Sequence, residues 1–141
     1  MEGQCEYCFV WVTITSTLGQ SGYDQQLTVL AIEHAGGVGA VAMASVPSGA
    51  PSISLAATAV GSYSYAVGHD YDTATGRTVG SRQTLMSQWI DTATRDTSWT
   101  QGTTGKSTSV GQIVTLNDTS PTADQWNTAA ISVLPWESTR E

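Results

Sequence analysis

The chain has 141 residues, of which 40% are hydrophobic and only 12% are charged, about half the charged share that is usual in globular proteins. Twelve acidic residues against five basic ones give a net charge of −7, and Lys106 is the single lysine. No basic patch can be assembled to neutralise phosphates, which argues against nucleic acid and against an anionic membrane surface as partners. The length suits one domain, residues 1–141, with a single core.

The first residues carry a CxxC pair, Cys5 and Cys8, and no secretory leader, because Met1 is not followed by a basic segment and an apolar stretch. Such a pair can be a redox couple, half of a zinc site or two unconnected thiols. Here a strand-like run follows it, whereas thioredoxin-like chemistry places the pair at the start of a helix. We interpret the two cysteines as incidental thiols and leave their oxidation state open.

Strand signals recur along the rest of the chain, separated by clusters of Gly, Pro, Ser, Asp and Thr that favour turns. Nine short strands are expected, at residues 9–18, 25–35, 40–46, 52–59, 62–69, 83–90, 96–101, 111–117 and 126–134. No stretch has the periodicity of an amphipathic helix, and no repeat is visible. The sequence therefore predicts an all-β fold, an antiparallel, jelly-roll-like β-sandwich of the concanavalin-like kind.

The loop after the strand at 62–69 reads GHDYDTATGR and places Asp70 two residues before Asp72, with Arg77 at its end. The EF-hand pattern fails here, because the fifth position from Asp70 is Ala74 and the twelfth is Ser81. A looser calcium site at Asp70 and Asp72 stays open. The alternative is a turn in which the aspartates bond nearby amides and Arg77 pairs with one of them.

Two tryptophans are candidates for a ligand platform, because sugar rings stack on exposed indole faces while neighbouring amides bond their hydroxyls. Trp99 shares a strand face with Gln101, and Trp126 precedes Asn127. The competing interpretation is that these large aromatic side chains fill the space between two sheets, with at most one of them acting as a platform.

A catalytic interpretation is weaker. A glycosidase needs two carboxylates across a cleft, and most acidic residues of this chain lie in predicted turns. A serine hydrolase would have only His34 and His69 as candidate bases, and no GxSxG elbow is present. The enzymatic alternative is a small secreted hydrolase of polysaccharides or esters with Asp70, Asp72 and Arg77 at its mouth.

Several motifs occur together in one order: GHDYD, QWIDT, DTSWTQ and NDTSPTADQWN. In that order and rough spacing, from about Thr13 to Pro135, they resemble a β-sandwich domain of bacterial secreted and cell-surface proteins. The chain departs from that pattern at His69, where Asn is frequent, at Tyr71, where Trp is frequent, and at Arg95, where Gly is usual. The resemblance implies an extracellular or cell-surface location for the parent protein.

Members of that family usually begin further upstream, with additional strands before the run at 9–18. The resemblance thus implies that this chain lacks the first strands of the domain, with residues 1–7 as a new start. An unpaired sheet edge would follow, and such an edge favours pairing with another chain. We therefore expect a homo-oligomer formed by strand exchange or strand addition.

Taken together, these features predict a non-catalytic extracellular module that binds a carbohydrate or another surface ligand, or that serves as a structural unit of a cell-surface assembly. No cofactor other than calcium is expected. The glycan-binding interpretation depends on Trp99, Gln101, Trp126 and Asn127.

Overall fold

The computed structural model describes residues 11–136, and the regular elements in that range are all strands. The all-β, antiparallel sandwich predicted from the sequence is confirmed. The eight strands are β1 (Ala35–Val46), β2 (Ser52–Ala56), β3 (Tyr63–Asp70), β4 (Thr78–Val79), β5 (Gln83–Asp91), β6 (Asp96–Thr103), β7 (Ile113–Ser120) and β8 (Trp126–Pro135). No helix long and apolar enough to cross a bilayer occurs among the described residues.

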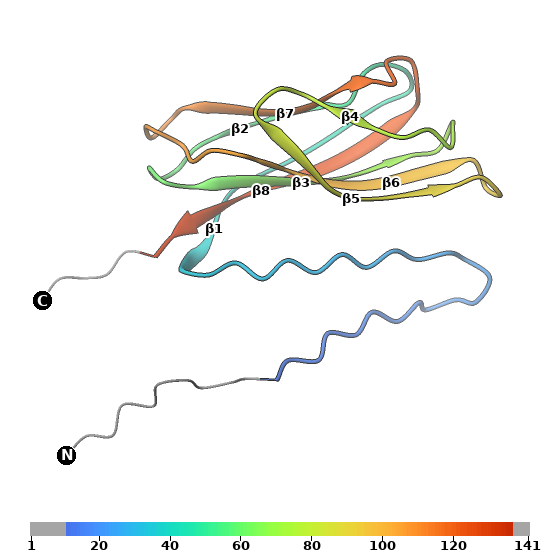
Figure 1. The fold of residues 1–141 in the computed structure, drawn as a ribbon, viewed down its shortest axis with the longest axis horizontal. Coiled ribbons are helices and arrows are strands. Elements are labelled where there is room, and N and C mark those ends of the chain that lie inside the picture. The colour runs from blue at the N-terminus through green and yellow to red at the C-terminus, as the bar shows by residue number, and fades with distance from the viewer. Residues whose placement is uncertain (1–10, 137–141) are drawn as a thin grey trace, which may run out of the picture.

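The strands form two antiparallel sheets that face each other (Figure 1). The larger sheet has the order β1-β8-β3-β6-β5, and the smaller one has the order β2-β7-β4. The chain changes sheet at most connections, which is the jelly-roll pattern of two interleaved Greek keys. β5 is the exception, because it forms a hairpin with β6 and extends the larger sheet at its edge.

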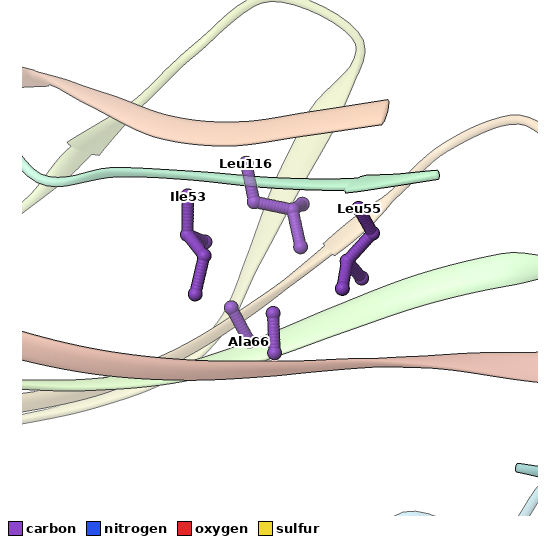
Figure 2. Packing of buried hydrophobic residues seen from close by; sticks show 5 residues of the cluster. Ile53, Leu55, Ala66 and Leu116 are labelled. Atoms are coloured by element: carbon purple, nitrogen blue, oxygen red, sulfur yellow. The ribbon is translucent and has the colours of Figure 1, made fainter. Parts of the chain in front are cut away.

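The apolar core lies between the sheets and is asymmetric (Figure 2). The smaller sheet contributes the long side chains Ile53 and Leu55 from β2 and Leu116 from β7, whereas the larger sheet contributes Ala66 and Ala130. Large side chains on one sheet opposite small ones on the other allow the two layers to interdigitate at close packing density.

Two of the expected strands are absent from the structure. Residues 11–34, which we call the leading segment, contain no strand, although most of the run at 9–18 and nearly all of the run at 25–35 fall within them. Alternation of apolar residues favours an extended chain but cannot supply the neighbouring strand that a ladder requires. Residues 9 and 10, like Cys5 and Cys8, lie outside the described residues.

The leading segment is extended but doubles back on itself, so that its second half lies along the outer face of the larger sheet and its first half lies farther away (Figure 1). It reaches β5 by two side-chain hydrogen bonds, from Gln26 Nε2 and from Thr28 Oγ1 to Ser87 Oγ, at 3.1 and 3.4 Å. Many of its apolar side chains, such as Trp11 and Tyr23, are exposed. The segment therefore partly covers the outer face without becoming a strand of the sheet.

Candidate functional site

The carboxylate of Asp70, which was a candidate catalytic and metal-binding group, points into the sandwich and is fully buried. β3 ends at this residue, and the strand's alternation turns its side chain inward. The amides of Asp72 and Thr73 donate to Asp70 Oδ1 at 2.7 and 3.3 Å, and Arg77 Nη2 donates to Oδ2. The loop is thus an aspartate-capped turn closed by an ion pair, the alternative that the sequence left open.

Arg77 is buried beside Asp70 and lies over the ring of Trp99, with its guanidinium carbon 4.3 Å from the ring centroid. The planar guanidinium suits this position, because it can pair with a carboxylate and contact an aromatic face together. Its Nε and Nη1 have no hydrogen-bond partner within the described part of the chain. Arg77 therefore holds the loop at 71–77 against the core.

Two more aspartates lie in the same polar region of the interior, Asp118 on β7 and Asp124 before β8. Asp124 accepts a hydrogen bond from Thr73 Oγ1 at 2.7 Å, whereas neither oxygen of Asp118 has a partner among the described residues. Burial raises the pKa of Asp118 to about 7, although the charge of Arg77 opposes the rise. Burial also raises the pKa of Asp70, against the lowering effect of its amide donors and of Arg77.

This buried cluster is closed to a substrate, because the side chains of Asp70 and Arg77 are both inaccessible to solvent. Asp72 is exposed, so the two aspartates of the expected calcium pair face different surroundings. Among residues 11–136, no group of three His, Cys, Asp or Glu side chains is placed to hold a metal ion. The cluster stabilises the loop at 71–77, and its carboxylates do not line an open cleft of the kind expected for a hydrolase.

Both tryptophans singled out in the sequence lie in the interior. Trp99 is 2% exposed and its Nε1 donates to Gln101 Oε1 at 2.7 Å, while Trp126 is 3% exposed and its Nε1 donates to the carbonyl of Gly49 at 3.0 Å. Their indole faces are therefore unavailable to a sugar ring. Of the four predicted ligand-binding residues, only Asn127 lies at the surface, where its side-chain amide donates to the hydroxyl of Tyr71.

The accessible site lies on the outer face of the larger sheet, where one residue from each strand forms a continuous row. The paired residues across the sheet, in order from β5 to β1, are Trp89, Ser98, His69, Asn127 and Ser45. Residues directly opposite each other in antiparallel strands share a face, so all five point outward. With neighbouring strands about 4.8 Å apart, the row spans roughly 19 Å.

A groove of about 640 Å³ covers the β5 end of this row. One side of the groove is formed by β3, β6 and the indole of Trp89, which is 36% exposed. The opposite side is formed by residues 22–28 of the leading segment. A largely preformed groove with an exposed aromatic ring and a few polar groups is typical of a small-ligand site.

The groove is acidic. Asp91 and Asp96 lie directly opposite each other across β5 and β6, and Asp24 faces them from the leading segment. His69 Nε2 lies 3.8 Å from Asp96 Oδ2, and hydrogen bonds from the amides of Ala93 and Thr94 lower the pKa of Asp91. None of the lining residues is Lys or Arg, so the groove repels anionic ligands and accepts neutral or cationic ones.

Trp89 was missed as a site residue, and the reason is a β-bulge. Leu85 pairs with Gln101 of the inner face, so regular alternation would also place Trp89 inside. The register shifts between Leu85 and Ser87, which adds Met86 and turns Trp89 outward. His69 could be found, because the alternation of β3 already places it on one face with Tyr65 and Val67.

Comparison of the chain with models of protein families, with curated proteins and with solved structures found no match. The geometry of the buried cluster and of the outer groove is therefore the basis for the functional conclusion.

Proposed function

We propose that this protein is a non-catalytic binding module that takes a neutral glycan in the groove on the outer face of its larger sheet. The observation that carries the proposal is the row from Trp89 to Ser45, which presents an exposed indole at one end and polar side chains beside it. Trp89 replaces Trp99 and Trp126 as the platform, since both of those side chains are buried.

The polar members of the row suit sugar hydroxyl groups. Ser98 and His69 can donate and accept hydrogen bonds, and Asn127 offers both an amide donor and an acceptor. Asp91 and Asp96 add carboxylate acceptors at the end of the groove. The absence of Lys and Arg from the lining argues for a neutral glycan over a sulfated or sialylated one.

From the resemblance noted in the sequence, we also propose that this module belongs to an extracellular or cell-surface protein of a bacterium. We do not extend the proposal to a hydrolase at Asp70, Asp72 and Arg77, because two of those side chains are sealed in the interior. Calcium is not part of the proposed site either, since the Asp70 carboxylate is already engaged by Arg77 and two amides.

A glycan array on the purified protein tests the proposal, run with calcium and again with chelator. We expect binding to neutral glycans in both conditions, no binding to anionic ones, and loss of at least tenfold in affinity for Trp89→Ala. Trp136→Ala is the matched control, because Trp136 is exposed beyond the end of β8 and does not line the groove. No binding to any glycan, or equal binding by Trp89→Ala, would refute the proposal.

A further inference from the structure

β1 forms one of the two edges of the larger sheet. β1 pairs with β8 on one side only, and from Val41 to Val46 this pairing is uninterrupted. No backbone hydrogen bond joins Val41–Val46 to any other described strand or loop. The other side of β1 therefore presents a row of backbone donors and acceptors ready for a further strand.

The other sheet edges are less suited to pairing. β2 has five residues and β4 has two, so each offers only a short ladder. β5 carries a bulge and ends in Asp91, and the leading segment rests on its Ser87. β1 has register irregularities before Val41, but Val41–Val46 pair regularly with β8, and none of the twelve residues of β1 is charged or is a proline. The Val41–Val46 stretch thus has no charge, proline or bulge that would block the pairing of an edge strand.

The charge pattern of β1 favours a second copy of this chain as the occupant. Two molecules of net charge −7 repel each other where acidic residues meet, and β1 itself contributes no charged residue to that repulsion. An antiparallel pair of identical strands is also closed by a two-fold axis, so it ends at a dimer instead of growing into a fibre.

The alternation of side chains restricts the registers in which β1 of one copy can pair with β1 of the other. Val41, Met43 and Ser45 pair with outward-facing residues of β8, so they lie on the outer face. Residues opposite each other must share a face, and a two-fold axis at Met43 satisfies this by placing Met43 opposite its own copy. Val41 then lies opposite Ser45, and Ala42 opposite Ala44.

A hollow of about 500 Å³ adjoins this position on the outer face and provides space for the partner's side chains. Met43, Val67 and Ala129 line it, together with polar groups of His69 and Asn127. Met43 itself is 83% exposed in the single chain. The flexible, apolar side chain of Met43 from the second copy suits such an irregular, partly apolar space.

We propose that two copies of this protein pair antiparallel through β1, about a two-fold axis at Met43, and so form one continuous sheet of both larger sheets. The groove at Trp89 lies toward β5, whereas the hollow beside β1 includes His69, Asn127 and Ser45, which also belong to the row proposed for glycan binding. The two proposals are told apart by their tests, because Trp89→Ala changes only the groove and the Met43 variants change only the edge.

Light scattering over a range of concentrations tests the proposal by measuring the molecular mass in solution. The samples are the wild type, Met43→Lys, Met43→Glu and a mixture of the two variants. Val110→Lys is the control, because it adds the same charge at an exposed position in the loop between β6 and β7. We expect two copies for the wild type and the control, one copy for each Met43 variant, and two copies again for the mixture, where opposite charges meet at the axis.

A wild type that stays a single copy would overturn the proposal. Met43→Lys that remains dimeric would also overturn it and would point to another surface, such as exchange of the leading segment. Failure of the mixture to recover the dimer would refute the register at Met43. Recovery in the mixture excludes misfolding as the cause of dissociation, because two unfolded variants could not restore each other's pairing.

Discussion

At the scale of single residues, the inner face of the larger sheet is shaped by a few close contacts. Gly68 on β3 lies opposite Trp99 on β6, and the indole occupies the space that a side chain at Gly68 would take. Trp99 in turn supports the guanidinium of Arg77. One glycine thus makes room for the aromatic ring on which the buried ion pair depends.

Gly68→Ala is expected to destabilise the protein by about 1–3 kcal/mol or more, the typical cost of overpacking a well-packed core. A Cβ there would clash with Cζ2 of Trp99, whose ring is held by its hydrogen bond to Gln101 and by Arg77. Urea unfolding measures the change, with Gly105→Ala as control, since that added methyl would meet nothing within 4 Å. Equal stability of the two variants would contradict the packing described here.

Asp70→Asn is expected to destabilise the protein by about 3–5 kcal/mol, because it leaves the buried guanidinium of Arg77 without its charged partner. Asp72→Asn, two residues away and exposed, should change stability by less than about 0.5 kcal/mol. Thermal unfolding of both variants checks this difference. Similar melting temperatures would mean that Asp70 does not hold the loop.

Asp118→Asn is expected to stabilise the protein at high pH. The folded-state pKa of about 7 lies above the ordinary value of 3.8, so the folded protein binds a proton more tightly than the unfolded chain. Wild-type stability therefore falls as the pH rises from about 4 to 7, and the variant removes a loss of at most about 4 kcal/mol. Urea unfolding at pH 5 and pH 8 should show the larger gain at pH 8, and a gain independent of pH would contradict it.

At the scale of elements, alternation in the sequence predicted most strands but could not identify their partners. Apart from the short β4, which lies in none of the expected runs, the strands from β2 onward lie close to the expected runs. β1 is longer than the run at 40–46 because it continues back to Ala35. The leading segment has equally good strand composition and remains unpaired. The β-bulge at Met86, which no local pattern marks, decides which face Trp89 occupies.

Limited proteolysis with chymotrypsin tests the description of the leading segment. We expect the first cuts after its exposed aromatic and leucine residues, such as Tyr23 and Leu27, because no strand pairing protects the backbone there. Fragments beginning near β1 should persist. Initial cleavage at Trp89 in β5, with the leading segment intact, would contradict this assignment.

At the scale of the whole molecule, the sequence predicted the fold class but not the grouping of residues that forms the outer groove, for one physical reason. A sandwich core needs only alternating apolar residues, whereas the outer groove depends on which strands become neighbours and on the register between them. Trp89, His69 and Asn127 are far apart in the chain and form a row only through the pairings of β5, β6, β3 and β8.

The same topology gives the two faces of the larger sheet different roles. Its inner face holds the buried ion pair and the tryptophans of the core, and its outer face presents the groove at β5 and the free edge at β1. We propose that ligand recognition belongs to the outer face.

The most direct test of this claim follows the indole N–H signals of the tryptophans by NMR during titration with neutral hexasaccharides built from glucose, xylose or mannose. We expect one of these sugars to shift the Trp89 signal, assigned by its loss in Trp89→Phe, and to leave the Trp99 and Trp126 signals in place. Shifts at Trp99 or Trp126 with Trp89 unchanged, or no shift with any of the sugars, would contradict this claim.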